Sequence, residues 1–279
     1  MGKTYLIFYI VAVLYALNVD AGNIIWQIGK ADNSASEFAL GPSGYKKFLS
    51  KDFGYEDRYF LIGYSKADED FPYVLPGPND VWGGTWRTSG WRTHSTNILF
   101  SLDRMPECGE YRLIVDLLDA DPKRSLVKIT VNSIEKKYEI KGKSEKVLDG
   151  IVSDSQGFVL EVPVTASDLK NGGNIVTISV LEGGWIVFDQ VRLEGSHSIA
   201  LKEISNSAFL RSVSPAEYEL KQCGSMIQPL LVDIEHLSGK PDLTVKLDGE
   251  LIFSSELDTA RYVFEVPMPA VKKKVKSKY

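Results

Sequence analysis

The residues best suited to chemistry lie in one short run, DVWGGTWRTSGWRTH, which spans residues 80–94. This run holds three of the five Trp residues of the chain, together with two Arg residues and one His. A sugar ring presents a flat C–H face edged by hydroxyl groups, so proteins hold it with exposed aromatic rings and with hydrogen-bonding side chains such as Arg. The run therefore predicts a carbohydrate-binding loop, and we expect its ligand contacts at Trp82, Trp86, Arg87, Trp91 and Arg92.

The same run also allows a structural interpretation. Gly83, Gly84 and Gly90 interrupt it and helical apolar spacing is missing, so the sequence predicts a loop. On such a loop the Trp rings could cover the open end of a sandwich, with the Arg side chains stacked on them. We expect a mixture, with one Trp buried and the others partly exposed. In the binding interpretation, Asn79 and Asp80 add hydrogen-bonding groups, and the Arg residues also pair with the carboxylate of a uronic acid.

Recognisable catalytic and metal-binding motifs are missing from the chain. The three His residues are His94, His197 and His236, and none lies in an HExxH or HxH pattern or near a Cys at zinc spacing. No nucleophile elbow, P-loop or dinucleotide-binding fingerprint is present. We therefore assign no catalytic residue and favour a binding module. Acid/base catalysis by a pair of carboxylates such as Glu37 and Asp189 remains an alternative.

The elements that must position this loop are strands. Short runs rich in Val, Ile, Tyr and Phe recur between Gly, Pro, Asn and Asp clusters, which predicts an all-β fold, a β-sandwich or jelly roll, over residues 22–196. One run alternates so that Val127, Ile129 and Val131 share one face. Residues 197–279 predict a second, smaller and incomplete β-sandwich, with a hairpin turn at residues 248–249 and a basic tail.

Composition and charge limit the compartment and the partners. Residues 1–21 combine Lys3, an apolar run and small residues before the cleavage point, which predicts a signal peptide and a secreted or periplasmic protein without a membrane span after cleavage. The net charge of −5 and the pI near 5.4 argue against a nucleic-acid partner. Cys108 and Cys223 fall in different predicted domains, so a bridge and two free or buried thiols both remain open.

Three segments together resemble one known domain. They are IIWQIGKADNSASEF (residues 24–38), YFLIGYSKADEDFPYV (residues 59–74) and NIVTISVLEGGWIVFDQVRLEG (residues 174–195). In this order they are similar to the C-terminal, galactose-binding-like jelly roll of the rhamnogalacturonan lyases of polysaccharide lyase family four. The resemblance implies recognition of pectic polysaccharide or its oligosaccharides. It also implies that catalysis belongs to a large N-terminal domain that this chain lacks, so a larger catalytic chain is an expected partner.

Related carbohydrate-binding jelly rolls carry a structural calcium ion, held by a carboxylate near the first strand and an Asp on the last strand. Glu37 and Asp189 match these two places, so the resemblance implies a calcium site there. The alternative for Asp189 is that its carboxylate accepts backbone N–H bonds in a turn.

Two other functions remain open at this point. The chain could be a small polysaccharide lyase or glycoside hydrolase, in which Arg87, Arg92 or His94 neutralises a uronate and Tyr73 or Glu37 transfers a proton. It could also be a spacer that positions the catalytic domain of a larger glycan-degrading enzyme.

Overall fold

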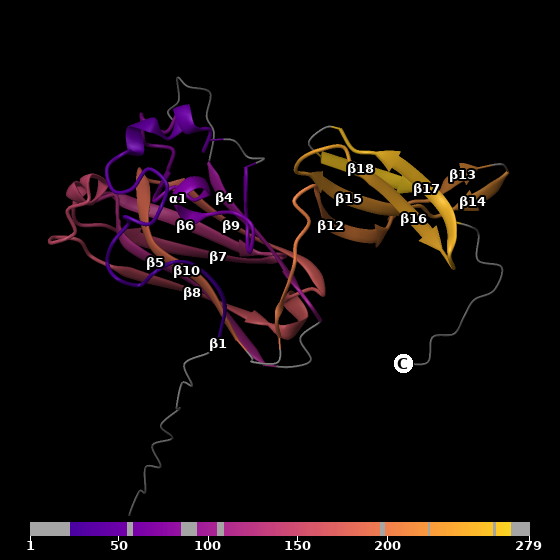
Figure 1. The fold of residues 1–279 in the computed structure, drawn as a ribbon, viewed down its shortest axis with the longest axis horizontal. Coiled ribbons are helices and arrows are strands. Elements are labelled where there is room, and N and C mark those ends of the chain that lie inside the picture. Colours follow the sequence, from indigo (N-terminus) through magenta and orange to yellow (C-terminus); the bar gives the residue numbers. More distant parts are fainter. Residues whose placement is uncertain are drawn as a thin grey trace, which may run out of the picture.

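The structure is a computed structural model that describes residues 23–54, 58–84, 94–104, 109–195, 199–222, 224–258 and 261–268. Two sheets packed face to face form a jelly roll in the first part of the chain (Figure 1). The strands of the first sheet are β1 (Asn23–Gly29), β3 (Val74–Pro76), β5 (Glu110–Ala120), β8 (Phe158–Thr165) and β10 (Trp185–Gly195). Those of the second sheet are β2 (Tyr59–Leu61), β4 (Ser95–Leu102), β6 (Arg124–Val131), β7 (Ile134–Lys141), β9 (Gly172–Glu182) and β11 (Leu201–Lys202).

The order of strands explains why distant segments meet. The first sheet runs β1-β10-β5-β8, and β3 pairs with the start of β10. The second sheet runs β11-β4-β9-β6-β7, with β2 parallel to β4. Because β11 pairs with β4, the second sheet includes Leu201 and Lys202.

The core lies between the two sheets. Val127, Ile129 and Val131 are fully buried, which confirms the face predicted from their alternation. The ring of Phe71 contacts that of Phe188 on β10 at a centroid distance of 5.1 Å. In the described ranges, helical structure is limited to α1 (Ala67–Asp70) and short 3-10 turns, which are η1 (Tyr45–Lys47), η2 (Leu49–Lys51), η4 (Glu145–Asp149) and η5 (Ala166–Asp168).

A smaller β unit follows the jelly roll. Its strands are β12 (Ala208–Pro215), β13 (Leu220–Gln222), β14 (Ser225–Ile227), β15 (Leu230–His236), β16 (Asp242–Leu247), β17 (Glu250–Glu256) and β18 (Arg261–Val266). The sheet β12-β15-β18 and the hairpins β13-β14 and β16-β17 make up this second unit. Asp248 and Gly249 form the predicted turn between β16 and β17 with φ of 50° and 88°. The predicted all-β fold, a jelly roll followed by a smaller β unit, is confirmed.

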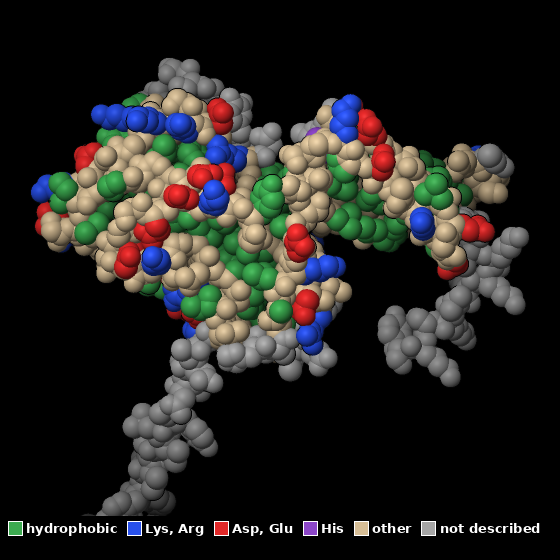
Figure 2. Space-filling view, viewed as in Figure 1, with side chains coloured by type: hydrophobic (Ala, Val, Ile, Leu, Met, Phe, Trp, Pro, Cys, Tyr) green, Lys and Arg blue, Asp and Glu red, His purple; other side chains and the backbone are tan. Residues whose placement is uncertain are grey.

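The second unit lies beside the jelly roll (Figure 1). A small apolar cluster joins the two. Phe209 of β12 is buried against Leu61 of β2 and Leu99 of β4. Asn206 donates a hydrogen bond of 2.9 Å to the Tyr64 hydroxyl beside this cluster. On the face drawn in Figure 2, acidic and basic side chains are interspersed over both units. None of the helices in the described part of the chain is long and apolar enough to cross a membrane.

Candidate functional site

The predicted carbohydrate-binding loop begins directly after β3 and rests on the 3-10 turns η1 and η2. Trp82 is half-buried, and its ring meets Tyr45 edge-on at a centroid distance of 5.2 Å. Phe48 contacts the same indole at 6.0 Å, also edge-on. Two aromatic rings therefore fix the orientation of Trp82. Because Trp82 is half-buried, it can both support the loop, as in the structural interpretation, and expose part of its ring, as in the binding interpretation.

Backbone contacts hold the start of the loop against the turn between β9 and β10. The N–H of Asn79 donates to the Gly183 carbonyl at 3.0 Å. The Asp80 carboxylate accepts the N–H of Trp82 at 2.9 Å, which makes an Asx turn. A Cβ at Gly83 would lie 2.4 Å from the Cβ of Pro76, so only glycine allows this close approach. The described part of the loop is therefore a fixed base.

Two side chains considered for a catalytic role, His94 and Tyr73, are buried in the structure. His94 is 2% exposed, packs on Phe48, and its Nε2 contacts the Gly83 carbonyl. Tyr73 is fully buried and donates its hydroxyl to the Leu148 carbonyl at 2.6 Å. Both side chains are part of the packed interior, so their burial does not favour the roles considered for His94 in neutralising a uronate and for Tyr73 in proton transfer.

Several predictions fall on residues outside the described ranges. These are Trp86, Arg87, Trp91 and Arg92 of the loop, Cys108 and Cys223, and the signal peptide over residues 1–21. They stay predictions. The structure therefore locates the base of the loop, through Trp82 and Asp80, rather than its tip.

Asp80 has an unusual electrostatic environment for a loop residue. Its side chain is buried, and this burial raises the pKa of Asp80 from 3.8 to about 7, while the N–H groups of Trp82 and Gly83 act in the opposite direction. The nearby Asp121 carboxylate adds to the rise. The buried Asp80 carboxylate therefore stabilises the base of the loop through its bond to the Trp82 N–H, and it is not exposed for hydrogen bonding to a sugar.

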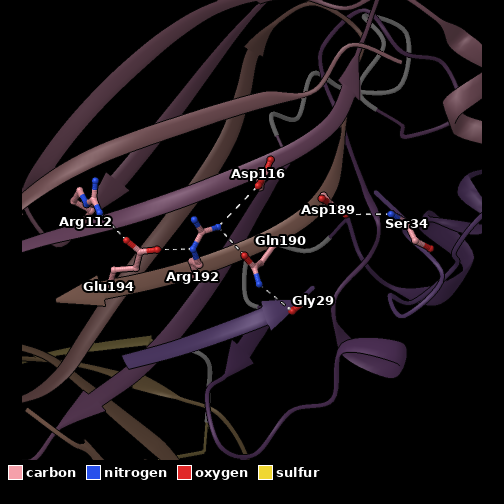
Figure 3. A network of polar contacts seen from close by, with 8 residues as sticks. All are labelled: Gly29, Ser34, Arg112, Asp116, Asp189, Gln190, Arg192 and Glu194. Atoms are coloured by element: carbon pink, nitrogen blue, oxygen red, sulfur yellow. Dashed lines mark hydrogen bonds and ion pairs between the residues drawn. The ribbon is translucent and has the colours of Figure 1, made fainter. Parts of the chain in front are cut away.

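Asp189 lies at a β-bulge in β10. The register against β5 pairs Phe188 with Leu117 and Gln190 with Asp116, so Asp189 is an extra residue on its strand. Its carboxylate accepts the N–H of Ser34 at 3.2 Å (Figure 3). Asp189 thus accepts a backbone N–H, which is the structural role considered for it as the alternative to calcium binding.

Glu37 and Asp189 are close enough to influence each other. Burial raises the pKa of Asp189 to about 6, and the carboxylates of Asp116, Asp32 and Glu37 contribute to the rise. Glu37 itself accepts the N–H of Lys30 at 2.9 Å. The local excess of negative charge suits a hard cation with oxygen ligands. In the described residues no three His, Cys, Asp or Glu side chains are grouped closely enough to hold a metal, so backbone carbonyls and water would have to complete such a site.

A chain of ion pairs runs beside Asp189 on the outer face of the first sheet (Figure 3). Arg192 contacts Glu194 at 2.7 Å and Asp116 at 3.9 Å, and Arg112 contacts Glu194 at 3.0 Å. Figure 3 shows Asp189 turned away from these arginines toward Ser34. Arg112 and Arg192 therefore form ion pairs with Glu194 and Asp116, and neither is drawn in contact with Asp189.

A second polar site lies where the second unit meets the jelly roll, and sequence reasoning did not find it. A cavity of about 400 Å³ opens there, and we call it the inter-unit cleft. Its lining residues are Tyr59, Ser95, Asn97, Ile175, Thr177, Arg211, Glu235 and Arg261. The alternation of Ile175 and Thr177 against buried neighbours is visible in the sequence. The pairings of β4 with β9 and of β4 with β2, which assemble the site, are not.

Comparisons with known proteins agree with the architecture. A family model described as CBM-like, polysaccharide lyase family 4, domain III, matches residues 24–193. This match confirms the resemblance stated for the three sequence segments. No curated protein matches the chain.

Several solved structures are similar to part of the chain. A family 35 carbohydrate-binding module from Cellvibrio japonicus is 13% identical, with a TM-score of 0.28, over 41% of this chain and 74% of that chain. A family 35 module in complex with a glucuronic acid containing disaccharide is 15% identical, with a TM-score of 0.26, over 39% of this chain and 72% of that one. A family GH115 4-O-methyl-α-glucuronidase is 17% identical, with a TM-score of 0.26, over 37% of this chain and 13% of the glucuronidase.

Proposed function

The chain belongs to the CBM-like domain III family of polysaccharide lyase family 4, and from that premise we propose that it is a carbohydrate-binding module that attaches to acidic plant cell-wall polysaccharide. The family match over residues 24–193 is the observation that carries the proposal. The module acts without cleaving its ligand and serves as an accessory to a separate or larger glycan-degrading enzyme. Its site of action is extracellular or periplasmic, in agreement with the signal peptide predicted for residues 1–21.

The binding surface that we propose is the loop after β3. Trp82 and its supports Tyr45 and Phe48 form a rigid aromatic base. Trp86 and Trp91 would supply further rings for the C–H faces of sugars, and Arg87 and Arg92 would pair with uronate carboxylates. Lys46 lies 5.6 Å from the Tyr45 ring and adds positive charge beside this base.

The rival function, a lyase or hydrolase, loses two of its candidate groups because His94 and Tyr73 are buried. Glu37 is partly exposed, but one of its carboxylate oxygens already accepts the Lys30 N–H. The geometry of the described residues therefore supports binding better than proton transfer.

A second part of the proposal concerns calcium. Glu37 and Asp189 are the residues that would hold the ion, together with backbone carbonyls and water. A bound divalent cation would offset the negative charge that Asp32 and Asp116 also contribute around Asp189. Because Asp189 is on β10 and Glu37 follows β1, the ion would tie the two segments together.

The test of the loop is a set of single substitutions in the full chain. Trp86→Ala and Arg87→Ala should each weaken retention on immobilised rhamnogalacturonan or homogalacturonan by about tenfold, as expected for the loss of one good contact. Val81→Ala is the matched control, because Val81 is 71% exposed on the same loop and is not aromatic. Unchanged binding in both test variants, with melting temperatures equal to wild type, would exclude the loop as the sugar site.

A further inference from the structure

The inter-unit cleft is built from regular structure on one side. Tyr59 on β2, Asn97 on β4 and Thr177 on β9 are direct cross-strand partners, so they form one row across three strands. Each of them points away from the core, because their neighbours Ile98 and Val176 are fully buried in it. Thr177 donates a hydrogen bond of 2.9 Å to the Asn97 side-chain carbonyl. The row is therefore an ordered polar surface.

The adjacent row has the opposite character. Leu61, Leu99 and Ile175 are cross-strand partners in the same three strands, and Phe209 of the second unit packs on them. The apolar row is therefore the docking contact. The row of Tyr59, Asn97 and Thr177, with Ser95 beyond it, lines a cavity of about 400 Å³. Tyr59 also packs against the apolar cluster at the edge of this cavity.

The second unit supplies the other wall with charged side chains. Arg211 is paired with the buried Glu235 at 3.0 Å. Arg261 holds Asp233 through two hydrogen bonds of 3.0 and 2.7 Å. Burial and the Glu235 carboxylate beside it raise the pKa of the Tyr59 hydroxyl, so this hydroxyl stays protonated. Arg211, Arg261 and Glu235 line the cleft, and Asp233 beside it pairs with Arg261. The wall is therefore rich in donors and acceptors, and each of its two cations has an acidic partner.

We propose that the inter-unit cleft binds a neutral saccharide of one or two sugar residues. Its volume is in the range of small-molecule sites, which is about 300–1,000 Å³. Hydroxyl, amide, guanidinium and carboxylate groups can each bond a sugar hydroxyl, which both donates and accepts. The Tyr59 ring and Ile175 offer the apolar surface that a sugar face needs. The inference rests on the proposed carbohydrate-binding function and adds a second site, for a different class of sugar.

Charge balance argues for a neutral ligand over a uronate in this cleft. A carboxylate entering it would have to compete with Glu235 for Arg211 and with Asp233 for Arg261. Displacing Glu235 would leave a buried, unpaired carboxylate, which is costly. Neutral hydroxyl groups can add to the existing hydrogen bonds without breaking these ion pairs.

The experiment is calorimetric titration of the full chain with neutral sugars, namely galactose, rhamnose, arabinose and galactobiose, and with digalacturonate. The test variant carries Thr177→Val together with Ser95→Ala, which removes two hydroxyl groups of the cleft and keeps the size of the Thr177 side chain. Thr130→Val is the matched control. Thr130 is the cross-strand partner of Thr177 on the next strand, and it does not belong to the cleft lining.

The expected result is that at least one neutral sugar binds, that the double variant weakens it about tenfold, and that Thr130→Val stays within about twofold, since each hydroxyl removed loses one modest hydrogen bond. Digalacturonate should be affected by neither change. If neutral sugars do not bind while the pectic polymer does, or if all variants bind them equally, the cleft inference is wrong and the proposed function stands. If neither neutral sugars nor any polymer binds, both fail.

Discussion

The indole of Trp82 and the phenol ring of Tyr45 meet edge-on, with centroids 5.2 Å apart and planes inclined by 73°. This contact fastens the first Trp of the loop to the 3-10 turn η1. We therefore expect Trp82→Ala to lower the free energy of unfolding by about 2–4 kcal/mol, because a half-buried aromatic ring loses its packing. Val81→Ala should change it by less than about 0.5 kcal/mol. Urea denaturation measures the free energy of unfolding of both variants. If Trp82→Ala were as stable as wild type, the contact of Trp82 with Tyr45 would not stabilise the fold.

Docking of the second unit depends on Phe209. Phe209→Ala removes the ring that packs on Leu61 and Leu99. Such a truncation typically lowers the free energy of unfolding by about 3–5 kcal/mol. Hydrogen exchange should accelerate in β12 and in β2, while β8 on the far sheet keeps its protection. Val213→Ala, on the same strand at 49% exposure, is the control. Unaltered exchange at β2 and β12 would contradict the docking contact.

The buried carboxyl of Asp80 makes stability depend on pH. Its pKa of about 7 in the folded chain lies above its ordinary value of 3.8, so the folded state holds a proton that the unfolded state has lost between these values. Stability is therefore lost as pH rises through this window. Asp80→Asn keeps an acceptor for the Trp82 N–H and removes the titration. Its melting temperature should fall less than that of wild type between pH 5 and pH 8, and parallel curves would contradict the assignment.

Calcium binding at Glu37 and Asp189 predicts a cation-dependent stability. Excess calcium should raise the melting temperature of the wild-type chain relative to a sample in chelator, because a ligand that binds only the folded state stabilises it. Asp189→Asn should abolish that difference. Glu161→Gln, which alters an exposed carboxylate in β8, should retain it. A wild-type melting temperature indifferent to chelator would remove the calcium proposal.

The sequence predicted the fold better than it predicted the sites. Alternation placed Val127, Ile129 and Val131 in the core, and the pair at residues 248–249 specified its hairpin, because both signals are local. The row of Tyr59, Asn97 and Thr177 joins strands far apart along the chain. Nothing in a single sequence fixes such pairing, so the inter-unit cleft required the structure.

The motif residues behind the family resemblance explain why it identified the fold and not the ligand. Trp26, Phe38 and Phe71 are core side chains. Asn174 is fully buried, and its side chain accepts the Lys170 N–H at 2.8 Å and donates to the Gly172 carbonyl at 2.9 Å. These residues preserve packing and turn geometry, so they carry little information about the sugar that is bound. The burial of His94 and Tyr73 likewise required the structure, since burial cannot be read from residue type alone.

The central claim is that the chain binds plant cell-wall polysaccharide without cleaving it. The most direct measurement titrates the purified full chain into rhamnogalacturonan while recording binding heat and the ultraviolet absorbance of unsaturated uronides in the same mixture. We predict saturable binding with no increase in absorbance and no new reducing ends. Release of unsaturated product or of reducing ends, or the absence of binding to rhamnogalacturonan and homogalacturonan alike, would contradict it.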